Sequence, residues 1–282
     1  MPTGTATVVL GLAAASSWGA ADFGGGLTSR RTSVFGVVLV SQFVGMALAA
    51  GLTLVRGETF PVGMDLVLCL AAGILGGIGI TALYQGLAVG RMGVVAPVTG
   101  VLAAVIPVAA GVLLEGAPPP MVLLGIGLAL AAVMLVSRVA DEGGGRAGLP
   151  EALLAGVAIG LFGVVISQLS DGQVFGALTT IRGVQAVLVI AVVVLTRSAW
   201  RPPGRMLPAL AIVGVLDMAG NSFYLLAVQT GALAVASVLS SLYPVATVIL
   251  AAAVLHERVS RDHAIGIALA VVAIALIGVG SA

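Results

Sequence analysis

The sequence predicts an all-α integral membrane protein with ten transmembrane helices, arranged as two inverted five-helix repeats. Three observations support this prediction: the composition, the spacing of the apolar runs, and a similarity between the two halves of the chain. Of the 282 residues, 60% are hydrophobic and only 8% are charged. Soluble domains carry roughly 25% charged residues, and a soluble fold could not bury so much apolar surface. The chain is therefore expected to lie in a lipid bilayer.

The apolar stretches are long enough to cross a bilayer as helices, which takes about 20 residues. The ten stretches are 6–27, 34–55, 64–88, 92–114, 120–138, 151–170, 174–195, 206–229, 232–255 and 263–280. They lack the alternation of apolar and polar residues that is typical of outer-membrane strands. The first stretch has its arginines after it and none before it, so we expect a spanning helix rather than a cleaved signal peptide.

Short connections rich in polar residues, proline or glycine end the stretches, for example EGAPPP after the fourth and RSAWRPPG after the seventh. The longest connection is RVADEGGGRAGLP at 138–150. Its glycine run and mixed charges are typical of a flexible linker. We therefore expect a first repeat at 1–140, a linker at 141–150 and a second repeat at 151–282.

The two halves are similar segment by segment and in the same order. VFGVVLVSQFVG pairs with VFGALTTIRGVQ, which places Gln42 opposite Arg182, and VLLEGAP pairs with AVLHERVS. An odd number of helices in each repeat forces the second copy to insert upside down relative to the first. Inverted repeats around a site at the bilayer midplane are a common plan among transporters.

The arginines indicate an orientation in the membrane. The connections after the odd-numbered stretches contain Arg30, Arg31, Arg91, Arg138, Arg146, Arg197, Arg201, Arg205, Arg258 and Arg261. The opposite side has only Arg56. The positive-inside rule then places the arginine-rich connections in the cytoplasm and both termini outside.

Three charged residues lie at membrane depth, away from the first and last residues of the predicted spans: Asp22, Arg182 and Asp217. A charge at that depth costs roughly 2.5–3.5 kcal/mol on insertion scales and usually faces a bundle interior or a watery cavity. Asn221 and Tyr224 follow Asp217 on the same helix face. This face is the best candidate for a cavity wall that binds substrate or carries a proton. The alternative is structural, with Asp217 paired to Arg182 and touching no ligand.

Arg182 also has two readings. It could bind a substrate carboxylate, with Gln42 as a second donor, or it could reach the interface if its helix begins later than expected. Asp22 precedes GGG near the end of the first stretch, so an interfacial position is favoured. Trp18, four residues earlier, is a further candidate.

The remaining polar candidates are Tyr84 and Gln85 in the third stretch and Ser241 in the ninth. Pro97, Pro107 and Pro244 are hinge candidates, because proline releases a helix carbonyl that nearby hydroxyls can satisfy. No metal or cofactor is expected, since HExxH, a P-loop and a Cys/His cluster are all missing from the sequence. An enzyme and a nucleic-acid partner are both disfavoured, the latter because there is no basic stripe.

The whole chain resembles the EamA family of the drug/metabolite transporter superfamily. The resemblance is carried by SSWGAADF, by LYQGLAVGRMGVVAPV, and by FYLLAVQTGALAVASVLSSLYPVATVILAAAVLHERVSRDHAIGIALAVVAIALIGV. The closing pattern of this family corresponds to Pro244, Glu257 and Gly266. In the first half Glu115 fits the pattern, but Pro107 lies nearer to it than the pattern asks.

The resemblance implies a secondary carrier in the bacterial inner membrane, commonly an exporter of amino acids or related metabolites, often coupled to proton entry. Alternating access through a central cavity is implied as well. The expected partners are a small-molecule substrate, the lipid bilayer, a coupling proton and a second copy of the chain in a homodimer. The alternatives are a non-catalytic membrane partner, such as a lipid-translocation subunit, and a channel.

Overall fold

A computed structural model describes residues 3–90, 92–136, 147–255 and 261–280. The described chain is helical, without a strand. Its elements are α1 Thr3–Ser29, α2 Val34–Arg56, α3 Gly63–Val89, α4 Met92–Glu115, α5 Pro120–Val136, α6 Leu149–Ile166, α7 Phe175–Thr196, η1 Gly204–Met206, α8 Leu207–Thr230, α9 Leu233–Ser240, α10 Tyr243–Leu255 and α11 Arg261–Gly280. The predicted stretches therefore correspond to observed helices, and helix α6 begins inside the segment assigned to the linker.

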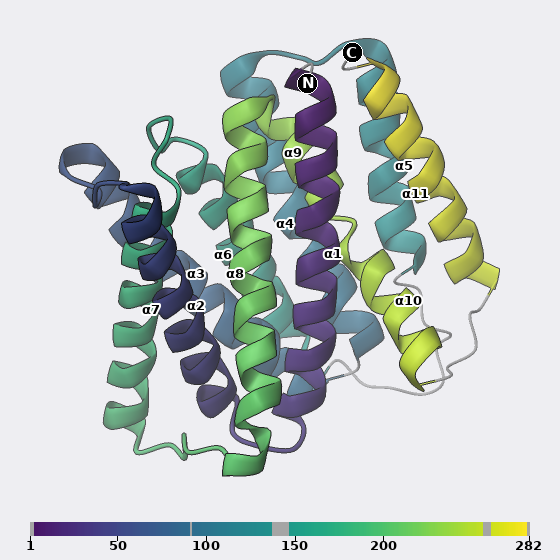
Figure 1. The fold of residues 1–282 in the computed structure, drawn as a ribbon. Coiled ribbons are helices and arrows are strands. Elements are labelled where there is room, and N and C mark those ends of the chain that lie inside the picture. The colour runs from purple at the N-terminus through teal and green to yellow at the C-terminus, as the bar shows by residue number, and fades with distance from the viewer. Residues whose placement is uncertain (1–2, 91, 137–146, 256–260, 281–282) are drawn as a thin grey trace.

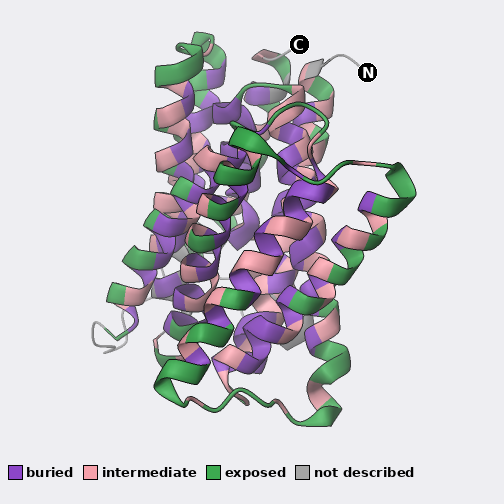
Figure 2. Cartoon of the chain, turned by 90° about the vertical axis from the view of Figure 1, so that its left-hand side faces the viewer, coloured by how far each residue is buried: buried purple, intermediate pink, exposed green. Residues whose placement is uncertain are grey.

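The described helices are those of a multi-pass membrane protein. Seven of them are long and apolar enough to cross a bilayer, and three shorter apolar segments are Pro120–Ala132, Leu233–Thr247 and Ala264–Ile277. Outward faces carry large apolar side chains, such as Val194 on α7 and Val271 on α11. Figure 2 shows exposed residues along the outer faces and buried residues toward the interior. Lipid, unlike water, solvates such a surface without penalty.

The helices pack side by side in one bundle (Figure 1). Helix α1 packs on α8, α3 on α6, α2 on α7, and α5 on α11 at one margin. Helix α4 contacts α6 and α9, while α1 contacts α9 and α10. The start of α1 and the end of α11 lie at one end of the bundle, and the α1–α2 and α7–α8 connections lie at the other. The arginines of these two connections are thus at the same end, as the sequence predicts.

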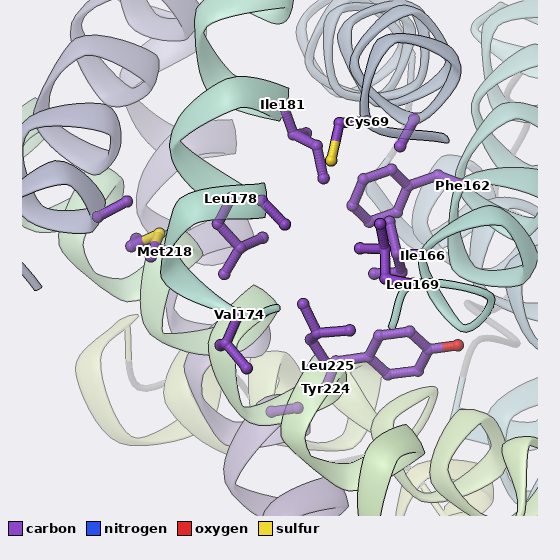
Figure 3. Close-up of a cluster of buried hydrophobic side chains, with 14 of the residues drawn as sticks. Cys69, Phe162, Ile166, Leu169, Val174, Leu178, Ile181, Met218, Tyr224 and Leu225 are labelled. Carbon is purple, nitrogen blue, oxygen red and sulfur yellow. The ribbon is translucent and has the colours of Figure 1, made fainter. Parts of the chain in front are cut away.

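One apolar cluster fills the space between α3, α6, α7 and α8 (Figure 3). Cys69, Phe162 and Leu178 belong to it, and Cys69 is buried as a free thiol. Tyr224 lies at its edge, with the hydroxyl pointing away from the labelled apolar side chains. The cluster packs against one face of α8. The polar face of α8 is therefore turned away from the cluster.

The predicted stretch 232–255 is interrupted and forms two helices, α9 and α10. The break falls at Ser241 and Leu242, just before Pro244, which has no N–H to continue the ladder. The Ser241 hydroxyl donates to the Val238 carbonyl at 2.7 Å, as expected for a serine-rich break. Pro244 therefore marks a helix interruption.

The other two hinge candidates differ from Pro244. Helix α4 is continuous from Met92 to Glu115 across both Pro97 and Pro107, so neither proline interrupts it. Pro107 is buried, whereas the side chain of Pro97 lies outside the part of the chain that the structure describes. His256 and Glu257 also lie outside the described residues.

Glu58, in the connection after α2, caps the start of α7. Its Oε2 accepts hydrogen bonds from the backbone N–H groups of Phe175 at 2.6 Å, Gly176 at 3.2 Å and Val174 at 3.3 Å. The first N–H groups of a helix have no partner within the helix. A carboxylate at this position is also stabilised by the positive end of the helix dipole. Arg56 pairs with the other carboxylate oxygen of Glu58 at 3.4 Å. The cap that Glu58 makes on α7 ties the α2–α3 connection to the second half of the chain.

We expect Glu58→Ala to lower the free energy of unfolding by about 0.5–2 kcal/mol, the range for a lost helix cap. The reason is that three N–H groups at the start of α7 lose their acceptor. Unfolding in detergent measures the change, and Asp171→Ala is the control because Asp171 is exposed and its side chain makes no hydrogen bond within the part of the chain that the structure describes. Equal stability of the two variants would contradict the cap.

Candidate functional site

A cavity lies inside the bundle, among helices from both halves of the chain. It is lined by Trp18, Asp22, Gln42, Gly76, Ile80, Leu83, Ala103, Ile159, Phe162, Gly163, Gln185, Asp217, Asn221, Tyr224, Ser237, Ser240, Ser241 and Tyr243. The volume of the cavity, taken as the space that the centres of water molecules can occupy, is about 100 Å³. A single water needs only about 10–15 Å³ measured in this way, so the cavity has room for several waters or for a small solute.

The polar face of α8 forms one wall of the cavity. Asp217, Asn221 and Tyr224 all line it, because residues four and three apart share a helix face. The Asn221 amide donates to the Asp217 carbonyl at 2.9 Å. The Tyr224 hydroxyl lies 2.9 Å from the Ser237 hydroxyl, which connects α8 to α9. The Tyr224 ring also packs on Trp18, with ring centroids 5.6 Å apart.

Arg182 and Asp217 form a buried ion pair. Arg182 Nη2 lies 2.9 Å from Asp217 Oδ2, and the Arg182 side chain is only 2% exposed. Arg182 Nη1 donates to Gln42 Oε1 at 2.8 Å. The structural reading of Asp217 thus has its predicted partner, although Asp217 also faces the cavity.

Gln42 accepts the hydrogen bond from Arg182 through its Oε1 and lines the cavity, so its Nε2 remains a donor there. One sequence expectation about Arg182 is corrected. Arg182 does not reach the interface, because α7 already begins at Phe175 and buries the side chain against α2. Gly45 makes room for it, since a Cβ there would lie 2.9 Å from the guanidinium carbon. The remaining nitrogen, Arg182 Nε, has no hydrogen-bond partner among the described residues.

Asp22 is placed differently from the interfacial position that the sequence favoured. Helix α1 continues through GGG to Ser29, and Asp22 lines the cavity one turn after Trp18. The glycines allow this, because the Gly25 position is in close contact with the Tyr84 ring from α3. The second cavity carboxylate therefore comes from the first half of the chain.

Helix α9 and the break that follows it supply three serine hydroxyls of the cavity wall. Ser237, Ser240 and Ser241 line the cavity, and Tyr243 opens the next helix beside them. The three serine side chains are at most 5% exposed to the outside. A broken helix at this depth brings polar groups into the interior, where they can meet a solute.

The structure does not bring every candidate to the cavity. Tyr84 is buried beside α1, Arg182 lies behind Asp217, and neither lines the cavity. Gln85 is exposed on the outer face of α3, so its candidacy is not supported. Gln185, Tyr243 and Phe162 were missed. Gln185 could have been found, because it lies three residues after Arg182 and shares its helix face.

The cavity is acidic. Asp22 and Asp217 line it, whereas the one described arginine nearby, Arg182, is held by Asp217 and Gln42. Within the described chain, no group of three or more His, Cys, Asp or Glu side chains is placed to hold a metal ion.

Comparison with known proteins gives two matches. The model of the EamA-like transporter family matches residues 146–279, which contain α6 to α11. One similar solved structure is a crystal structure that is described only as that of a protein. The similarity covers 96% of this chain and 96% of the other chain, with a TM-score of 0.78 and 18% sequence identity. At that identity the likeness shows the fold alone. No curated protein matches the sequence.

Proposed function

Because residues 146–279 match the model of the EamA-like transporter family, we propose that the protein is a secondary active transporter of a small metabolite. The observation that carries the proposal is the polar cavity inside a bundle of apolar helices. Its walls contain two carboxylates, three amides and several hydroxyls. Polar groups buried at membrane depth are costly and typically mark a substrate or ion pathway.

An inverted-repeat architecture is part of the proposal, with residues 1–140 and 151–282 as the two halves. The helix packing supports it. If each helix of the first half (α1 to α5) is swapped with its counterpart in the second half (α6, α7, α8, α9–α10 and α11), the main helix–helix contacts of the bundle are reproduced. Under this exchange α1 on α8 becomes α6 on α3, and α2 on α8 becomes α7 on α3. The contact of α4 with α6 becomes that of α9 and α10 with α1.

Alternating access follows from two such halves rocking around a central site. The break at Ser241 and Leu242 provides a point at which α9 and α10 change their relative angle. The sequence has no P-loop, so the driving force proposed is an ion gradient, in particular entry of protons. We propose export of an amino acid or related compound across a bacterial inner membrane, with the arginine-rich end of the bundle in the cytoplasm.

The competing function is a non-catalytic membrane partner, such as a subunit that assists lipid translocation. That role requires no solute to reach the interior. The cavity, with Asn221 and Ser240 on its wall, favours the transporter.

Thiol labelling tests the choice between these functions. Cys69 is the only cysteine, so a Cys69→Ala background accepts single cysteines at Asn221 and Ser240, with Ile212→Cys as the control on the lipid-facing side of α8. In proteoliposomes, a membrane-impermeant thiol reagent is expected to label the two cavity positions from either side. A concentration gradient of mixed amino acids across the membrane should raise the labelling rate from one side and lower the labelling rate from the other side. Labelling from one side only, or no amino-acid flux, would contradict the proposal.

A further inference from the structure

Asp22 is an acidic side chain in the cavity whose charge has no partner. It lines the cavity from α1. No hydrogen bond or ion pair joins its carboxylate to a described residue, whereas Asp217 has Arg182 at 2.9 Å. Asp22 is half-buried on the cavity wall, and an ionised carboxylate in the interior of a membrane bundle is costly without a counter-charge, so the site is incomplete as it stands.

The groups around Asp22 do not neutralise it. The described titratable groups that interact electrostatically with it are Asp217 from α8, Tyr84 from α3 and Tyr243 from α10, and none of them is a cation. Arg182, on α7, is already engaged by Asp217 and by Gln42 on α2. Counted with that ion pair, the ionised cavity carries one uncompensated negative charge.

The neighbours of Asp22 suit a cation. Trp18 lines the cavity one helical turn before Asp22, and Tyr243 lines it from α10. Aromatic faces attract ammonium and guanidinium groups, most strongly where water is excluded. The serine hydroxyls and the amide oxygens of Gln185 and Asn221 on the other walls can accept hydrogen bonds from such a group.

We propose that Asp22 is the counter-ion for a positively charged cargo, so that the cavity binds a small organic ammonium compound. This inference rests on the proposed function and assigns its substrate class. In the empty cavity a proton on Asp22 removes the charge, and the ammonium group replaces that proton when it binds. Each binding event then releases one proton to the solution on the side where the cavity is open. Asp217, in contrast, positions Arg182 and does not exchange its partner.

Fluorescence of Trp18 tests the inference in the purified full-length chain. The sequence has two tryptophans, so Trp200→Phe leaves Trp18 as the single reporter. The probes are butylammonium chloride, 1-butanol and sodium butyrate, which share a chain length and differ in charge. We expect a saturable change with butylammonium only. Its affinity should rise with pH by up to tenfold per unit, the limit for one released proton.

In the same background Asp22→Asn should weaken butylammonium binding at least tenfold and remove its pH dependence, while Asp171→Asn, an exposed acid, should change neither. Butyrate or butanol binding as tightly as butylammonium, or no saturable response to butylammonium, would overturn the inference. If Asp22→Asn does not fold, the pH dependence in the parent decides, since a pH-independent affinity overturns it as well. Amino-acid flux without cation preference would defeat only this inference, whereas cation binding without any flux would defeat the proposed function.

Discussion

Replacing Arg182 by methionine is expected to lower the free energy of unfolding by about 3–5 kcal/mol, the range for breaking a buried ion pair from one side. The substitution leaves the Asp217 carboxylate in the bundle without its counter-charge and removes the donor to Gln42. The Arg182 side chain is 2% exposed, so the charge that is lost lies in the interior of the bundle. Reversible unfolding in detergent measures the loss.

The double variant Arg182→Met with Asp217→Asn separates the pair from simple packing. Once both charges are gone, no uncompensated ion is buried, so at least half of the lost stability should return. Arg31→Gln is the control, because Arg31 is exposed in the α1–α2 connection. A double variant that is as unstable as the sum of the single variants would show that the two side chains are not coupled.

Filling the cavity should stop transport while the fold survives. Ala103→Phe, on α4, adds a ring to a cavity wall where water centres have about 100 Å³, and a change of this kind in a packed site costs about 1–3 kcal/mol. Flux of labelled amino acids in proteoliposomes is expected to fall at least tenfold, because the ring occupies the solute space.

Ala109→Phe is the matched control for this experiment. It makes the same chemical change on the same helix, but Ala109 is exposed on the outer face of α4, where lipid can accommodate the ring. Its flux should equal that of the unmodified protein. Equal loss of flux in both variants would mean that α4, rather than the cavity, is being disturbed, and the cavity would lose its place in the mechanism.

Much of the candidate site could be predicted because it follows from one helix. The spacing of Asp217, Asn221 and Tyr224 fixes their common face whatever packs around it, and all three line the cavity. The ion pair between Asp217 and Arg182 was one of the two predicted alternatives, because opposite charges within the membrane attract each other. Pro244 indicated the position of the break between α9 and α10 for an equally local reason, the missing N–H.

Other parts of the site depend on how helices turn relative to one another. Gln85 and Gln185 are chemically alike, yet one is exposed on α3 and the other lines the cavity from α7. Asp22 was expected near the interface because of the glycines that follow it, but α1 runs on through them. The local sequence does not contain the close contact with Tyr84 that makes those glycines part of the interior.

The sequence by itself determined that this is a helical membrane protein, which apolar stretches are helical, and which residues share a helix face. These properties depend on the local transfer of apolar residues into lipid and on the 3.6-residue helical period. Only the tertiary structure decided that Asp22 faces the cavity without a partner while Asp217 is paired with Arg182. That choice depends on the rotation and contact of helices far apart in the chain, because in lipid it is close packing and polar pairing that select the neighbours of a helix.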